Sequence, residues 1–173
     1  LKNYAQARFH YRKASHLNST DSHLYFKIAG TYMHEEHWES AVKNIENAMR
    51  INKSQTDYYF ALAKCYIQLN RIKEAVIHFS SFIKARPKNA NGWKELIKCL
   101  YDADYLEEAL EQVYNAQKNT NYKPLFYFYK SAIFFALGKS KEALLQLEFG
   151  MQKSSGLIKK FIELNPSLLQ HQA

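Results

Sequence analysis

The sequence predicts an all-α fold, a right-handed α-solenoid in which antiparallel helix pairs stack one on the next. Three observations predict this class. The 173 residues include only 5 Gly and 3 Pro, too few for the many tight turns of an all-β fold. Residues of similar size recur every 34 positions, and the apolar residues inside each period have helical spacing. One helix pair cannot bury its apolar stripe alone, so successive pairs are expected to stack.

Alanine marks the period most clearly. It stands at five positions that are each 34 residues apart: Ala7, Ala41, Ala75, Ala109 and Ala143. A large aromatic residue lies 16 positions before each of the last four: Tyr25, Tyr59, Trp93 and Tyr127. Helices pack at about 8–10 Å, and the closest crossings need small side chains. The alanines are therefore expected at helix crossings, with the aromatic rings filling the space on either side.

Each period is expected to hold two helices, as residues 56–89 illustrate. The first helix has apolar residues at i, i+3, i+4 and i+7: Tyr59, Leu62, Ala63 and Tyr66. The second helix repeats that spacing: Ile72, Ala75, Val76 and Phe79. Short breaks such as Asn70-Arg71 and Leu137-Gly138 separate the two helices of a pair. A glycine there can adopt the left-handed conformation that ends a helix.

Applied to the whole chain, the period gives six segments. They are the second helix of a truncated repeat (1–21), four complete units (22–55, 56–89, 90–123 and 124–157), and a capping helix with a tail (158–173). This division predicts nine to eleven helices. The cap has an apolar face: Leu157, Ile158, Phe161, Ile162 and Leu164. The half unit lacks its partner helix, so we expect a fragment whose residues 1–17 present an apolar face able to self-associate.

A helix–turn–helix of 34 residues with these positions resembles the tetratricopeptide repeat (TPR) family. The matching positions are the aromatic residue, a small residue four positions later, the alanine of the second helix and a small residue seven positions after it. Pro87 holds the proline position of its unit. The resemblance covers residues 22–157 and the half unit before them. Phe82 and Ile97 replace small residues and Lys130 an apolar one, so helix packing is expected to be looser or shifted there.

The resemblance implies a non-catalytic protein–protein interaction scaffold, which binds a peptide or partner helix in a concave groove. Such grooves are lined mostly by the first helix of each pair, here called helix A, and the second is helix B. Helical phase then gives eight groove residues: Phe26, Lys27, Phe60, Lys64, Lys94, Lys98, Tyr101 and Phe128. A competing interpretation is that Phe60 and Phe128 pack against neighbouring helices. The alternative function is a structural or oligomerising segment of a larger TPR array, or a regulatory domain of a multidomain protein.

Charge sets the expected chemistry of the partner. The chain has 24 Lys and Arg against 16 Asp and Glu, a net charge of +8 with neutral histidine. The excess is scattered along the units, so nucleic-acid binding is not expected. We expect a protein or peptide partner with acidic and apolar residues. Only Lys94 and Lys98 match the spacing with which one TPR subfamily grips the carboxylate termini of chaperones, so chaperone binding is not inferred.

No residue set indicates an enzyme, a metal site or a cofactor. The sequence has no GxGxxG, GxxxxGK[ST] or GxSxG motif, and five glycines cannot build a phosphate loop. The segment His34-Glu35-Glu36-His37 has histidines at i and i+3, whereas zinc-protease helices need i and i+4. We therefore interpret it as a solvated turn.

The two cysteines and the absence of long apolar runs complete the expectations. Cys65 and Cys99 hold the same place in successive units, roughly 10 Å apart, which favours two small core residues over a disulfide. A reducing, cytoplasmic location is expected from so few cysteines. No run of 18 apolar residues occurs, so membrane insertion is not expected.

Overall fold

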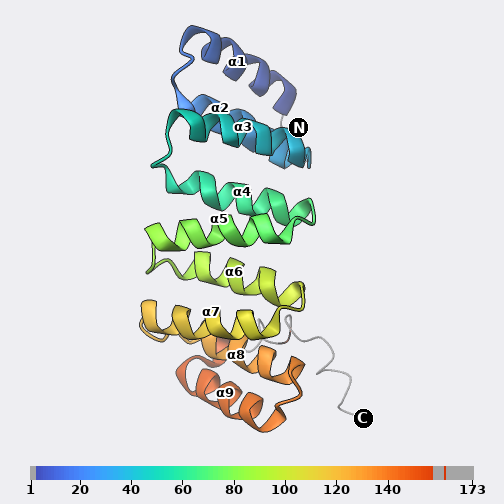
Figure 1. Ribbon diagram of the computed structural model, residues 1–173, viewed down its shortest axis with the longest axis vertical. Helices are drawn as coiled ribbons and strands as arrows, with labels where there is room; N and C mark the ends of the chain where they lie inside the picture. Colours follow the sequence, from blue (N-terminus) through green and yellow to red (C-terminus); the bar gives the residue numbers. More distant parts are fainter. Residues whose placement is uncertain (1–2, 158–161, 163–173) are drawn as a thin grey trace. The chain divides into compact units, whose positions relative to one another are not determined.

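The computed structural model describes residues 3–157 and residue 162 (Figure 1). These residues form nine α-helices and one short 3-10 helix, and they contain no strand. The elements are α1 (Tyr4–Leu17), α2 (Ser22–His34), α3 (Trp38–Ile51), α4 (Thr56–Gln68), α5 (Ile72–Ala85), α6 (Ala90–Asp102), α7 (Leu106–Asn119), α8 (Leu125–Ala136), α9 (Ser140–Lys153) and η1 (Ser155–Leu157). The predicted all-α class is confirmed. The expected capping segment 158–173 lies outside the described residues, apart from Ile162.

The chain forms two compact units. Unit 1 spans Leu1–Ala85 and holds α1 to α5, and unit 2 spans Arg86–Ala173 and holds α6 to α9 with η1. In unit 1, α2 pairs with α3 and α4 with α5, while α1 packs on α2 and α3 on α4. In unit 2, α6 pairs with α7 and α8 with α9. The helices A are α2, α4, α6 and α8, and the two helices of each pair run antiparallel (Figure 1).

The turn between helix A and helix B has the same geometry in all four pairs. One residue of each turn is left-handed: Glu36 (φ 60°), Asn70 (φ 56°), Asp104 (φ 63°) and Gly138 (φ 73°). The next residue donates its N–H to a carbonyl near the end of helix A, for example from Arg71 to Tyr66 at 2.8 Å. This is the Schellman pattern, which satisfies carbonyls that a helix end leaves unpaired. The 34-residue period therefore also sets where each helix A ends.

The recurring alanines are core residues, as expected for positions at helix crossings. Ala41, Ala75, Ala109 and Ala143 have no exposed surface, and Ala7 is half-buried. Protein interiors are close-packed, so a larger side chain at such a crossing would push the helices apart. The alanine period is therefore also the period of the helix packing inside each unit.

The three departures from the repeat pattern are accommodated in different ways. Ile97 of α6 is wholly buried, and α6 and α7 pack less extensively than the other A–B pairs. Phe82 is buried against Phe60, with the ring centroids 5.0 Å apart. Lys130 places its ammonium 4.2 Å from the centroid of the Tyr114 ring, which is a cation–π contact.

Both cysteines are core residues, as predicted. Cys65 and Cys99 are buried free thiols. Burial disfavours the thiolate and raises the pKa of each thiol to about 11. Since the thiolate is the nucleophilic form, neither side chain is suited to redox chemistry near neutral pH. None of the described helices has the length and apolar character to cross a bilayer.

Helix α1 differs from the expectation of an apolar outer face. Two large apolar residues are exposed on it, Phe9 (64%) and Leu17 (87%). Its other exposed side chains are mostly polar: Gln6, His10, Arg12, Lys13 and His16. The outer face is therefore mixed rather than apolar, because the partly buried Tyr4, Ala7, Tyr11 and Ala14 lie on the face of α1 that packs on α2. We do not propose self-association through it.

Candidate functional site

Helices α2 and α4 present the candidate groove residues of unit 1. The two helices touch through Phe26 and Tyr58, whose ring centroids are 4.8 Å apart. The Tyr58 hydroxyl also donates to Oγ of Ser22 at 2.9 Å, and Tyr58 is buried. These contacts hold the two helices A side by side. We define the A face of unit 1 as five residues of this surface: Phe26, Lys27, Gly30, Phe60 and Lys64.

Lys27 and Lys64 supply the charge of the A face. Both side chains are exposed. Within the part of the chain that the structure describes, neither ammonium has an ion pair or a hydrogen bond. Two cations on neighbouring helices with no ion-paired carboxylate create a positive potential that favours an acidic ligand, although Asp57 lies two turns from Lys64 on α4.

Phe26 and Phe60 hold the same register in successive pairs, and both are half-buried. Phe60 packs against α5, with ring centroids 5.6 Å from Phe79 and 5.0 Å from Phe82. The packing interpretation therefore holds for most of the Phe60 ring. The part of each ring that stays accessible is the apolar portion of the A face.

Gly30 lies at the centre of the A face, in the middle of α2. A Cβ atom placed on Gly30 would meet no heavy atom of a neighbouring residue within 4 Å. Packing therefore does not require a glycine, although glycine inside a helix costs about 1 kcal/mol relative to alanine. The position leaves a bare strip of helix surface, which another backbone can approach closely. One period later, the same register on α4 holds Lys64.

The two candidate groove lysines of unit 2 have carboxylate partners on their own helix. Lys94 forms an ion pair with Glu95 at 2.7 Å, and Lys98 forms one with Asp102 at 2.5 Å. These acidic residues offset the lysine charges, so α6 presents a weaker positive potential than the A face of unit 1.

Phe128 of α8 is wholly buried and belongs to a cluster with Ala132. Tyr101 and Leu157 are among the residues packed against this cluster. Burial, and after it the charge of Asp102, raises the pKa of Tyr101. The structure therefore gives Phe128 the packing role rather than a contact surface for a ligand.

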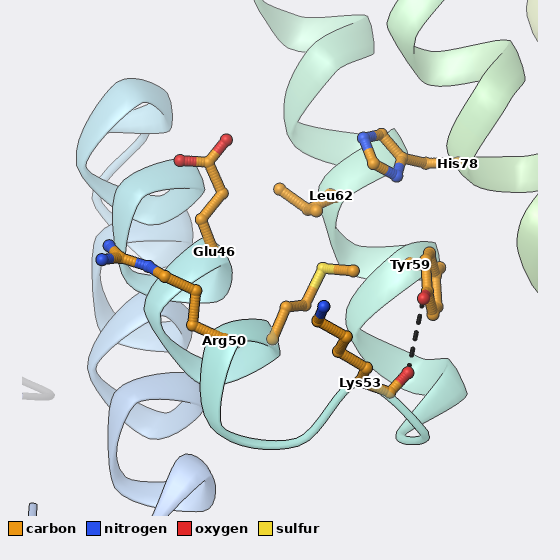
Figure 2. A pocket seen from close by; sticks show the side chains of 7 residues that line it. Glu46, Arg50, Lys53, Tyr59, Leu62 and His78 are labelled. Carbon is orange, nitrogen blue, oxygen red and sulfur yellow. Dashed lines mark hydrogen bonds between the residues drawn. The ribbon is translucent and has the colours of Figure 1, made fainter.

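A hollow of about 350 Å³ opens on the helix-B side of unit 1 (Figure 2). It lies over α4, between α3 and α5, and seven residues line it: Glu46, Met49, Arg50, Lys53, Tyr59, Leu62 and His78. Figure 2 shows Glu46 and Lys53 toward opposite ends, with Tyr59, Leu62 and His78 along one wall. None of these residues was predicted as a site residue. Tyr59 and Leu62 of α4 were expected to be core residues, and the other five lie on α3, α5 and the α3–α4 connection, where the TPR resemblance implies no ligand contact.

His78 is part of an aromatic wall. Its ring stacks on Tyr66, with centroids 5.4 Å apart and an interplanar angle of 9°, and lies 6.2 Å from Tyr59. Its Nδ1 atom is buried and has no hydrogen-bond partner among the described residues. Burial lowers the pKa of His78, and the charges of Glu46 and Glu74 only partly oppose this. The imidazole is therefore neutral at pH 7, and the wall is uncharged.

Lys53 is the cation of the hollow. Figure 2 shows its side chain rising from the α3–α4 connection into the open space, while the Arg50 guanidinium extends away from Tyr59. The Arg50 guanidinium donates to Asn47, whereas no described residue pairs with the Lys53 ammonium. The Tyr59 hydroxyl donates to the Lys53 carbonyl at 3.3 Å, which ties the connection to α4.

The segment 34–37 forms the turn between α2 and α3. His34 stacks on Tyr4 at a centroid distance of 5.0 Å, and Glu35 forms an ion pair with Arg8. The turn thus attaches α1 to α2, a role the sequence did not suggest. Across the described residues, no three His, Cys, Asp or Glu side chains gather closely enough to hold a metal ion.

Comparisons with known proteins agree with this architecture. The family described as anaphase-promoting complex, cyclosome, subunit 3 matches residues 1–82. Two solved structures are similar in fold. MamA is 14% identical, the match covers 91% of this chain and 92% of MamA, and the TM-score is 0.78. YrrB is 18% identical, the match covers 90% of this chain and 80% of YrrB, and the TM-score is 0.73. A third is TTC0263, a thermophilic TPR protein of Thermus thermophilus. It is 15% identical, the match covers 96% of this chain and 91% of TTC0263, and the TM-score is 0.63. No curated protein matches the chain in sequence. The fold is therefore the TPR-like α-solenoid that the sequence resemblance predicted.

Proposed function

We propose that the chain is a non-catalytic protein-interaction scaffold, and that the A face of unit 1 binds an acidic segment of a partner protein. The observation that carries this proposal is the pair of exposed lysines, Lys27 and Lys64, beside the bare helix surface at Gly30. Carboxylates of the ligand lie opposite the two ammonium groups, and an apolar side chain contacts Phe26 or Phe60. The apolar contact supplies most of the affinity, and the lysines supply steering and register.

The comparisons support the general role by analogy. YrrB is described as a TPR protein with an unusual peptide-binding site, and the matching family is named for a subunit of a larger complex. A fold alone does not assign a ligand, so the site has to be argued from its own residues. In unit 2, Lys94, Lys98 and Tyr101 remain candidate contacts, with a weaker field because Glu95 and Asp102 pair with the lysines.

Capture from native extract tests the proposal. The immobilised parent is compared with Gly30→Trp, which fills the bare strip, and with Lys64→Glu, which reverses a charge. The matched controls are Gly30→Ala, which adds only a methyl group where nothing lies within 4 Å, and Lys118→Glu, an exposed position on α7. We expect both controls to retain the partners of the parent, and both test variants to lose the same partners. Capture should also weaken with salt.

If both test variants retain every partner of the parent at low salt, the A face is not the binding surface. Melting temperatures of all the variants are measured alongside, because equal stability excludes unfolding as the cause of any loss. Gly30→Trp is suited to this control, since a Cβ atom at this position meets no heavy atom of a neighbouring residue within 4 Å.

A second candidate function, as one segment of a larger helical array, is favoured by α9. Leu144 and Met151 are 57% and 41% exposed. Residues at the same registers on earlier helices B are less exposed: Val42 of α3 and Gln117 of α7 are buried (8% and 4%), and Met49, Val76 and Leu110 are partly buried. Helix α9 therefore presents an apolar surface at positions where α3 and α7 pack against the next helix A. In the capture experiment, loss of partners with Leu144→Glu but not with Lys64→Glu would favour this candidate.

A further inference from the structure

The hollow of unit 1 depends on which residues occupy two positions of the repeat. Glu46 and Leu62 line it. Two periods later, in unit 2, the same positions hold Tyr114 and Lys130, and the Lys130 ammonium lies over the Tyr114 ring at 4.2 Å. In unit 2 the Lys130 side chain thus spans the space between the two helices and contacts Tyr114. In unit 1 the shorter Leu62 does not span the equivalent space to Glu46.

The walls of the hollow are mostly apolar, and two of their polar groups have partners within the chain, the Tyr59 hydroxyl and the Arg50 guanidinium. Met49, Tyr59 and the neutral His78 form most of the accessible apolar surface, and Leu62 lies beneath it with 1% of its surface exposed. The Tyr59 hydroxyl donates to the Lys53 carbonyl, which holds one edge in place. Ligand pockets of this kind combine an apolar lining with a few polar groups that fix orientation. A volume of about 350 Å³ lies at the lower end of the usual range for such pockets.

The charges give the hollow a direction. Glu46, toward one end, accepts a hydrogen bond from the Tyr66 hydroxyl at 3.4 Å. Lys53, toward the other end, has no described carboxylate partner (Figure 2). Unit 1 as a whole carries 12 Lys and Arg against 7 Asp and Glu, so the surrounding field also favours an anionic ligand.

We infer that this hollow is a second binding site, which takes one apolar or aromatic side chain of a partner protein together with a carboxylate beside it. The apolar side chain lies against Met49 and Tyr59, above the buried Leu62, and the carboxylate pairs with Lys53. Glu46 repels a second carboxylate at the opposite end and so fixes the orientation of the segment. The site lies on the helix-B side, so it is separate from the A face and its failure would leave the proposed function intact.

Short Gly-Ser peptides provide the probe. Each carries one Phe and, one to four positions away, either Glu, Gln or Lys. Fluorescence anisotropy measures the affinity, and methyl NMR of Met49 and Leu62 reports where the peptide binds. For the parent we expect Glu peptides to bind roughly threefold more tightly than Gln peptides, the usual effect of a partly solvated ion pair, and Lys peptides to bind most weakly.

Charge reversal at Lys53 is the decisive variant. Lys53 is exposed in a connection, so Lys53→Glu should leave the melting temperature unchanged and reverse the order, with Lys peptides binding best. The matched control is Lys118→Glu, which changes the net charge equally at the unit 2 equivalent of Arg50 and should keep the order of the parent. Equal binding of Glu and Lys peptides to the parent would overturn the inference. The inference would also be overturned if peptide binding left the Met49 and Leu62 methyl signals unmoved. A third refuting result would be a dimer in analytical ultracentrifugation whose formation, without peptide, shifts those methyl signals.

Discussion

Replacing Glu36 by glycine is expected to stabilise the protein. Glu36 has φ 60°, in the left-handed region, where the Cβ atom of an ordinary residue costs about 1–2 kcal/mol. Glycine removes that cost but adds about 0.4–1 kcal/mol of chain entropy to the unfolded state. Taken at the midpoints of these two ranges, the net gain in the free energy of unfolding is about 0.8 kcal/mol. The other three turns of this kind hold Asn70, Asp104 and Gly138, residue types that tolerate the conformation better.

The assay is thermal unfolding followed by circular dichroism. For a chain of this length, the gain corresponds to a rise in the melting temperature of about 1–4 °C. Glu36→Gln is the control, because it removes the charge but keeps the Cβ atom, and it should leave the melting temperature unchanged. Glu36→Asn should fall between the two. A glycine variant no more stable than the glutamine variant would refute the argument that backbone conformation limits stability at this turn.

Two further predictions concern packing and pH. Ala109→Leu, at a position with no exposed surface, should overpack the crossing of α7 and lower the free energy of unfolding by about 1–3 kcal/mol in denaturant titration; an unchanged midpoint would contradict the alanine register. His78 has a pKa below its ordinary value of 6.5, so the unfolded state binds its proton first and stability falls as the pH drops below about 6.5. His78→Phe should lose less stability than the parent between pH 7.5 and pH 5.5, and parallel losses in the two proteins would argue against a buried neutral imidazole.

The fold could be predicted from the sequence because the same 34-residue period determines the buried positions, the helix pairs and the turns between them. The alanine register gave the crossings, and the break at Asn70-Arg71 gave the position of a left-handed turn. The chain path into α8 could not be predicted in the same way. The helix begins at Leu125, one residue after the predicted start of the unit 124–157, but Asn121 and Tyr122 before it both adopt positive φ. The 34-residue period cannot predict this turn, because Asn121 and Tyr122 are not residue types that mark a left-handed conformation as glycine does.

The candidate site was predicted only in part. Helical phase identified the exposed lysines of the A face, because a charged side chain on the face opposite the core has little choice of direction. It could not separate contact from packing for Phe60 and Phe128, because burial depends on how near the neighbouring helices come. The hollow was missed for a similar reason. Its walls come from three helices, and the space between Glu46 and His78 is not visible in the pattern of any one of them.

The Schellman turns have a consequence for how the molecule acquires its structure. Each turn closes with hydrogen bonds between residues only a few positions apart, as from Arg71 to Tyr66. Most packing partners are likewise neighbours along the chain, since α2 packs on α3 and α4 on α5. Little loop-closure entropy has to be overcome before such contacts form, and topologies of this kind fold quickly. Nucleation can then begin at any helix pair and spread to its neighbours, so no single hairpin is obligatory as the first to form.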